Sequence, residues 1–494
     1  MNFLKRVAPI WMIVSFFGCE QPSRPNQVGA FVVTIVNGDQ GTQKNPRVFS
    51  TDLVEYTVNI EARTNDGTNK LDDSFNGWVV VSVLPTGKLE QDPLAVEMKN
   101  GKAQNVKVAF KMAFGPVRIV VTEEGYTPRI NDPGNSVCLN GKDDDADGYA
   151  DFPADKGCFY ANDENEEGGG GAVGATESIF FANPRIEDVQ KPSSIGAGGD
   201  ASVLYQQRII VDRGWLMVAR VGVDGLYVTD MDGVTWDGAQ FTVDPLLLSY
   251  RSVFAFNFST PLNLQEGDCL VQLDGTVEEF YGFTEIGKPT WKKGDYEFCA
   301  AKARAAGLSE AECPKDEIGS NEAQAVQCRV TVENLANTPM DITKMVIEVD
   351  RVERSVWDDR FLELERYEAA LVQVSDVNVF DELRECDVNG NGVVDWSSDQ
   401  ESDCSNDCGD TAGCVVWETY SRYQQWTVTF TDGLGEKREL AVVSVGAIPD
   451  FDPVKSPGKK LGKLVGTLRH ISFGRPAWIL EPRRVADCPD CKNE

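Results

Sequence analysis

The chain has 494 residues, of which 41% are hydrophobic and 25% charged, and its formal net charge is −31. Its length predicts about three domains, and its composition is typical of globular rather than disordered proteins. The negative charge argues against a surface that binds nucleic-acid phosphates through clustered lysines and arginines. The single histidine, His470, excludes sites that need two imidazole groups. Its place in the alternating stretch LRHISFG favours a structural over a catalytic role.

Residues 1–18 have the features of an export signal. Lys5 and Arg6 precede an apolar run that is too short to span a bilayer, and Gly18 stands before Cys19. The stretch Phe-Phe-Gly-Cys resembles the lipobox of bacterial (myxobacterial-type) surface lipoproteins. The resemblance implies an exported protein held to the cell-envelope membrane by a lipid on Cys19, with residues 19–27 as a tether. Glu after the cysteine favours the outer membrane under the sorting rules of such lipoproteins. An ordinary signal peptide with an incidental cysteine is the alternative.

Residues 28–130 contain short alternating or β-branched runs separated by Gly, Pro, Asn and Asp turns. The runs are AFVVTIVNG, LVEYTVNIEART, GWVVVSVLP, AQNVKVAFKM and PVRIVVTEEG. Their spacing is typical of sandwich strands and resembles that of an immunoglobulin-like β-sandwich. The later stretch ENEEGGGGAVGATE predicts a linker and a domain boundary, so residues 138–167 are expected to form an acidic loop and linker.

Two acidic loops have the ligand spacing of calcium sites, in which oxygens at odd-numbered positions converge on one cation and a glycine at position 6 permits the turn. Both loops lack the acid expected at position 12, so an acid at position 13 is expected to complete the coordination. The loops resemble the DxDxDG loops of dockerins and thrombospondin type 3 repeats, which implies Ca²⁺ as the cofactor. Solvated acidic loops are the alternative. The predicted ligands are Asp143, Asp145, Asp147, Tyr149 through its carbonyl, Asp151 and Asp155 in the first loop, and Asp387, Asn389, Asn391, Val393 through its carbonyl, Asp395 and Asp399 in the second.

The 13 cysteines become an even number once Cys19 is set aside. Because disulfides persist outside the cytoplasm, we expect local disulfide bonds. The terminal CPDC could be half of a zinc or redox site, but no second cysteine pair or nearby histidine completes it, so a disulfide is favoured. The disulfide candidates are Cys138, Cys158, Cys386, Cys404, Cys408, Cys414, Cys488 and Cys491, whereas the connectivity of Cys269, Cys299, Cys313 and Cys328 stays open.

The later two-thirds of the chain contains an internal repeat. GDCLVQLDGTV, followed by GKPTW at 287–291, is echoed by GKKLGKLVGTL, followed by GRPAW at 474–478. With the strands upstream, each copy predicts an OB-type barrel of five or six strands. In the first copy, DGTVEEFYGFTEI resembles the OB-like modules that accompany the nuclease domain of secreted bacterial nucleases. In the second, LERYEAALVQV and EPRRVAD resemble the start and end of the same module. The expected segments are an OB-like module at 176–293, a disulfide-stapled connector at 294–354, a second OB-like module at 355–487 with the calcium loop 386–414 inserted, and a tail at 488–494.

The expected fold is therefore all-β and multidomain: an immunoglobulin-like β-sandwich followed by two OB-like β-barrel modules, with disulfide-bounded acidic calcium loops. The function that the sequence favours is a non-catalytic, calcium-stabilised, lipid-anchored cell-envelope protein that binds a protein or polymer partner or has a structural role. A nucleic-acid or polysaccharide binding protein is the alternative, in which the net charge disfavours nucleic acid. A calcium-using hydrolase is a third possible function, but no GxSxG, Walker or HExxH motif is present. The aromatic residues Tyr227, Phe280, Tyr281, Phe283, Trp291 and Trp478 are expected in cores rather than on a stacking surface.

Overall fold

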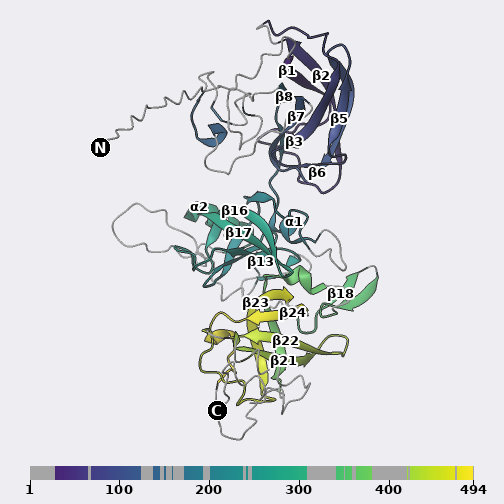
Figure 1. The fold of residues 1–494 in the computed structure, drawn as a ribbon. Coiled ribbons are helices and arrows are strands. Elements are labelled where there is room, and N and C mark those ends of the chain that lie inside the picture. Colours follow the sequence, from purple (N-terminus) through teal and green to yellow (C-terminus); the bar gives the residue numbers. More distant parts are fainter. Residues whose placement is uncertain are drawn as a thin grey trace, which may run out of the picture. The chain divides into compact units, whose positions relative to one another are not determined.

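The computed structural model divides the chain into two compact units, Met1–Ala182 and Asn183–Glu494. The all-β, multidomain fold is confirmed, because strands in several sheets dominate the described ranges and only short helices accompany them (Figure 1). No described helix is long and apolar enough to cross a membrane. The predicted signal segment, tether and lipidated Cys19 lie outside the described residues. The structure describes residues 28–64, 68–123, 137–144, 150–151, 158, 172–192, 201–236, 241–242, 248–308, 341–349, 351–358, 363–380, 420, 423–444, 446–472 and 476–492.

The first unit is a sandwich of two antiparallel sheets. One sheet has the strand order β1-β2-β6-β4 and the other β5-β3-β7-β8, with β9 also paired to β7. Tyr56, Val58, Ile60 and Ala62 alternate along β2 and are fully buried, because successive side chains of a strand point to opposite faces. The five predicted strands are present, and both sheets contribute to one core. The bounds are β1 Val28–Asn37, β2 Val54–Thr64, β3 Gly77–Leu84, β4 Lys88–Leu89, β5 Leu94–Met98, β6 Lys102–Lys111, β7 Gly115–Glu123, β8 Val173–Ala175 and β9 Ile179–Phe181.

The first unit extends further along the chain than the sequence predicted. The sandwich was expected to end at residue 130 and the next domain to begin at 176, but β8 and β9 both pair with β7 and the unit runs to Ala182. Strand β7 is almost wholly buried, and its backbone groups need hydrogen-bonding partners that β8 and β9 supply. The glycines that precede β8 made this stretch look like a linker, so the short strand was missed.

The second unit begins with α1 (Ile186–Gln190) and a five-stranded barrel. β11 pairs with β12, β12 with β15, β15 with β17, β17 with β16, and β16 with β11, so the pairing returns to its starting strand. β10 adds a strand to the edge of β16, and β13 and β14 pair only with each other. The bounds are β10 Arg208–Val211, β11 Leu216–Val221, β12 Gly225–Asp230, β13 Thr235–Trp236, β14 Phe241–Thr242, β15 Ser252–Phe256, β16 Cys269–Phe280 and β17 Phe283–Lys293.

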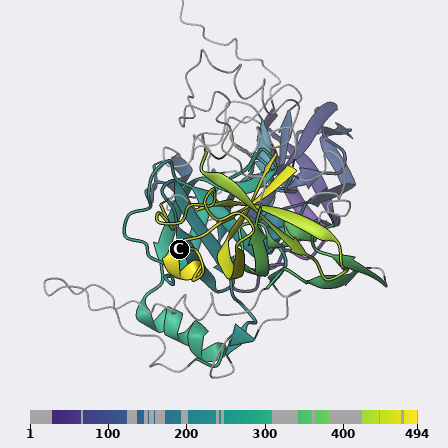
Figure 2. The ribbon, with the colours of Figure 1, turned by 90° about the horizontal axis from the view of Figure 1, so that it is seen from below.

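The second barrel repeats this arrangement, with the closed order β20-β21-β22-β24-β23 (Figure 2, from green to yellow). In each barrel a single parallel pair, β15 with β17 or β22 with β24, completes the ring. The repeated sequences therefore occupy matching strands, β16 and β23. The predicted calcium loop 386–414 falls between β20 and β21 in the sequence and lies outside the described residues. The bounds are β20 Leu371–Val379, β21 Gln425–Thr431, β22 Lys437–Val443, β23 Lys460–Ser472 and β24 Pro476–Glu481, followed by η5 Val485–Asp487.

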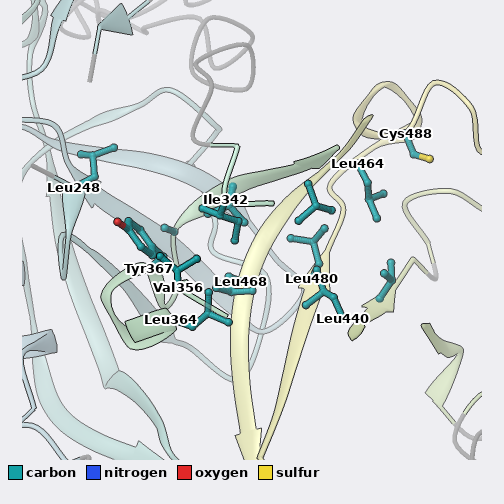
Figure 3. Close-up of a cluster of buried hydrophobic side chains, with 14 of the residues drawn as sticks. Leu248, Ile342, Val356, Leu364, Tyr367, Leu440, Leu464, Leu468, Leu480 and Cys488 are labelled. Carbon is teal, nitrogen blue, oxygen red and sulfur yellow. The ribbon is translucent and has the colours of Figure 1, made fainter. Parts of the chain in front are cut away.

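A connector links the two barrels. Its helix α2 (Tyr296–Ala305) begins at Asp295, whose side chain accepts a hydrogen bond from Phe298 N at 2.9 Å. A disulfide between Cys269 and Cys299 attaches α2 to β16. The strands β18 (Val346–Val349) and β19 (Val352–Ser355) form a hairpin, and η4 (Glu363–Tyr367) leads into β20. One cluster of buried hydrophobic side chains runs from the first barrel through the connector into the second, and Figure 3 shows part of it.

Candidate functional site at the junction of the two barrels

An aromatic face of the first barrel packs against the second barrel. Tyr227 on β12 and Phe254 on β15 are cross-strand neighbours, and their ring centroids are 4.7 Å apart. Phe254 is also 5.6 Å from Phe283 of β17. These rings share a buried cluster with Ala369 and Leu371, which lie at the start of the second barrel. The aromatic face is therefore covered by protein.

Arginine side chains lie over this face. The guanidinium carbon of Arg469 on β23 is 5.6 Å from the ring centre of Phe254 and 5.2 Å from that of Phe283. That of Arg220 on β11 is 5.3 Å from the ring centre of Tyr227. Cations at these distances are attracted to the electron-rich ring faces. The aromatic rings and the two cations thus form one layer between the barrels.

A partly buried ion pair crosses the junction. Arg220 Nη1 of the first barrel donates to Glu481 Oε2 of the second at 2.5 Å and to Thr467 Oγ1 at 2.6 Å. Tyr227 donates from its hydroxyl to the same Glu481 oxygen at 3.2 Å, and burial raises the pKa of this phenol, so that it stays protonated. Arg469 Nη1 lies 3.6 Å from the other oxygen of Glu481. The Glu481 carboxylate is therefore neutralised by arginines from both barrels.

Beside this pair, Glu365, Glu368 and His470 bring three potential metal ligands together. Glu365 belongs to η4, Glu368 follows it, and His470 comes from β23. One ligand atom from each lies within 4.8 Å of those of the other two. His470 Nδ1 is 3.1 Å from Glu365 Oε1. All three side chains are largely buried.

The imidazole ring is held from two sides. It stacks on Trp478 of β24, with centroids 4.6 Å apart and planes inclined by 15°. The carbonyl oxygen of Gly282, in the turn between β16 and β17, is 3.2 Å from Nδ1. Gly282 has φ +90°, and a Cβ there would lie 3.1 Å from two atoms of the ring, so glycine suits both the backbone and the close approach. The predicted structural role of His470 remains a prediction, although the residue is buried in a strand.

The acids around this group are held by the first barrel. Thr284 N donates to Glu368 Oε2 at 3.1 Å, and Thr284 Oγ1 donates to Glu279 Oε1 at 2.9 Å. Burial, followed by the nearby charge of Glu365, raises the pKa of Glu368 well above its usual range. Burial also raises the pKa of Glu285 to about 7. The junction therefore contains carboxyl groups that take up protons unless a cation neutralises them.

The two glutamates of this site were not identified from the sequence. They stand three residues apart in LELERYEAAL, which resembles the start of an OB-like module but carries no metal-binding motif. Their nearness to His470 arises only when the barrel closes and β20 pairs with β23. The pattern of charged residues before an apolar strand was the only available signal, and it is common to many surface helices.

Only a small part of the first predicted calcium loop is described. Asp143 is exposed, and Asp151 is half-buried and accepts a hydrogen bond from Gly141 N at 2.7 Å. The other predicted ligands lie outside the described residues: Asp145, Asp147, Tyr149 and Asp155 of the first loop and Asp387, Asn389, Asn391, Val393, Asp395 and Asp399 of the second. Calcium binding therefore stays a prediction.

The expectation that disulfide bonds are present is confirmed. Cys138 is bonded to Cys158, at the two ends of the first acidic loop, and Cys488 to Cys491. Arg118 Nη1 donates to the Cys158 carbonyl at 2.8 Å, which attaches the loop to strand β7. The candidates Cys386, Cys404, Cys408 and Cys414 lie outside the described residues.

A groove of about 610 Å³ lies on the second barrel. It is open between β20 and β21, where only two residue pairs connect the strands, and segment 343–344 of the connector borders it. Its charged residues are Lys344, Asp376, Lys437, Arg438 and Glu439. Because positive and negative side chains are mixed in the groove, it suits a neutral or weakly charged polar ligand better than a polyanion.

The comparisons with known proteins give no relative. No protein-family model, no curated protein and no solved structure matches the chain.

Proposed function

We propose that this chain is a non-catalytic, calcium-stabilised protein of the cell envelope, anchored by a lipid on Cys19, with a structural or partner-binding role. The observation that carries the proposal is the junction of the two barrels. Tyr227, Phe254 and Phe283 would be the stacking residues of a polymer-binding barrel, but they pack instead against the second barrel and its arginine. An interface of this kind makes two modules into one rigid block, as a spacer or scaffold requires.

A second candidate, polysaccharide binding, is favoured by the groove on the second barrel. Its volume is within the range of small-ligand sites. Its walls offer hydroxyl and amide groups, such as those of Thr429, Ser375 and Asn378, which suit sugar hydroxyls. The net charge of −31 makes nucleic acid the weaker choice of polymer.

Lipidation tests the anchoring part of the proposal. In Cys19→Ser, no thioether can form at this position, so metabolic labelling with a fatty-acid probe is expected to be lost. The protein is expected to move from the detergent phase to the aqueous phase on phase separation. Cys488→Ser, which alters a cysteine of the tail disulfide, serves as the control and should retain the label. Equal labelling of Cys19→Ser and wild type would contradict the proposal.

Calcium is expected to raise the unfolding midpoint by a modest amount. Loops without a bidentate Glu at position 12 should bind with a dissociation constant on the order of 10⁻⁴–10⁻³ M, and each site that binds only folded protein adds RT ln(1 + [L]/Kd) to stability. Magnesium should have a smaller effect, since it requires a tighter octahedral shell. The double change Asp143→Ala and Asp387→Ala should abolish the shift while thiol titration still finds the disulfides formed. A wild-type melt that calcium leaves unchanged would show that the loops are only solvated acidic segments.

A further inference from the structure

We propose that Glu365, Glu368 and His470 bind one divalent transition-metal ion, of the Zn²⁺ or Mn²⁺ class, at the junction of the two barrels. This site is separate from the two acidic loops, and it goes beyond the proposed function because it does not depend on lipidation, calcium or a partner. Within the part of the chain that the structure describes, it is the one group of three acidic, histidine or cysteine ligands close enough to share an ion.

The spacing of the three side chains fits a single ion. Zinc–ligand bonds to imidazole nitrogen and carboxylate oxygen are about 2.0–2.2 Å, so two ligands on opposite sides of an ion are separated by roughly 4 Å. One atom from each of the three residues already lies within 4.8 Å of the others. Small rotations of the carboxylates would therefore bring all three ligand atoms onto one ion without moving the backbone, and a water molecule would take the fourth position of a zinc ion.

A second observation points to a ligand at this place. Glu368 is only 2% exposed, and among the described residues its Oε1 atom has no hydrogen-bond partner, while its Oε2 accepts from Thr284 N. A buried carboxylate oxygen without a partner is costly, because it loses its hydration and gains nothing in return. A cation bound at Oε1 would remove this cost.

The surroundings fix the orientation of the ligands before an ion arrives. Thr284 holds one oxygen of Glu368 from the first barrel, and Trp478 and Gly282 confine the His470 ring. Such outer contacts set ligand direction in metal sites and are part of their affinity. They also make the site depend on both barrels, since Thr284 and Gly282 belong to the first and His470 and Trp478 to the second.

The donor set selects the class of ion. Calcium and magnesium take oxygen ligands, whereas imidazole favours zinc and other transition metals. Two carboxylates supply the two negative charges that neutralise a divalent ion in a buried place, where an unbalanced charge is strongly unfavourable. The predicted all-oxygen loops and this mixed site should therefore bind different ions.

Metal content of the full-length protein tests the site. The protein is stripped with a chelator, returned to buffer with excess Ca²⁺ and no reductant, and then exposed to ZnCl₂ or MnCl₂, so that the loops and the disulfides contribute little. We expect about one Zn²⁺ or Mn²⁺ per chain by elemental analysis after desalting, and a rise in the unfolding midpoint that grows with metal concentration. Glu368→Gln keeps the shape of the side chain but removes the charge, and it should lose both effects.

Glu363→Gln is the matched control. Glu363, at the start of η4, is as buried as Glu368, but its carboxylate pairs with Arg354 and Arg366, so this variant should keep the bound metal even if it is less stable. Should Glu368→Gln fail to fold, His470→Gln replaces it. Failure of the wild type to retain either ion would overturn the proposal. So would retention of the metal by a folded Glu368→Gln or His470→Gln variant, and the calcium result would stand in either case.

Discussion

Replacement of Arg220 by Met is expected to lower the free energy of unfolding of the second unit by about 3 kcal/mol. The change removes the charge that neutralises Glu481, and breaking a buried ion pair by deleting one partner typically costs about 3–5 kcal/mol. The side chains of Arg220 and Glu481 are 18% and 16% exposed, so water replaces the lost contact only in part. We expect the lower end of the range, because Arg469 still lies 3.6 Å from Glu481. Denaturant unfolding followed by tryptophan fluorescence measures the difference.

Two further variants make this result specific. Lys460→Met removes an ion pair with Asp376 whose members are 64% and 65% exposed, and it should change stability very little because solvent screens the pair. The double change Arg220→Met and Glu481→Met leaves no buried charge unpaired and should recover much of the loss. An Arg220→Met variant as stable as Lys460→Met would show that the junction does not depend on this pair.

The stability of the second unit is expected to fall as the pH rises from about 4.5 to about 7. Glu285 faces Glu278 across the β16–β17 pair, and burial, opposed by Arg469 and aided by Glu278, raises its pKa from 4.5 to about 7. In this window the folded protein keeps a proton that the unfolded chain has released, so folding binds protons and stability declines with pH. The contribution of the Glu285 proton to the stability of the second unit is complete below pH 4.5 and absent above pH 7. One such proton gives a slope of at most about 1.4 kcal/mol per pH unit.

Glu285→Gln should reduce this slope by the part that one proton contributes, since the amide resembles the protonated acid and does not titrate, whereas Glu368, whose pKa is also raised, still contributes. Glu439→Gln, at an exposed position of β22, should keep the wild-type slope. The measurement is a series of denaturant melts across the window, in the presence of a chelator so that bound metal does not alter the junction. A wild-type slope that survives in Glu285→Gln would assign the pH dependence to another group.

The strands and the internal repeat could be predicted because they follow from local patterns. Alternation in β2 marks its buried side, and the repeated Gly-Thr pairs lie inside the matching strands β16 and β23. Strand β8 could not be found, since its three residues gain stability only from pairing with β7. Local disulfide bonding was foreseeable for Cys138 and Cys158, but four cysteines close together in the sequence left the partner of Cys269 undecided until the position of α2 was known.

The junction could not be predicted, because its residues are distant in the sequence. Arg220 and Glu481 are separated by 261 positions, and nothing in the surroundings of either residue indicates the other. Tyr227 and Phe283 were correctly expected to be buried, whereas the same expectation was wrong for Phe280 and Tyr281, which are exposed at the turn between β16 and β17. The burial of Tyr227 and Phe283 against a second barrel depends on how two folded modules meet. Sequence patterns predict individual strands, whereas this site forms only where the two folded barrels pack together.

The position of the junction residues along the chain determines when the aromatic face becomes covered. The last strand of the first barrel, β17, ends at Lys293, whereas Arg469 and Glu481 lie on β23 and β24, near the end of the second unit. A chain that emerges from its N-terminus can close the first barrel long before these strands exist. Until then Tyr227, Phe254 and Phe283 form an uncovered apolar patch, which is a site for misassociation between incomplete chains. Chaperone protection should therefore matter most in the interval between completion of the first barrel and arrival of the last two strands.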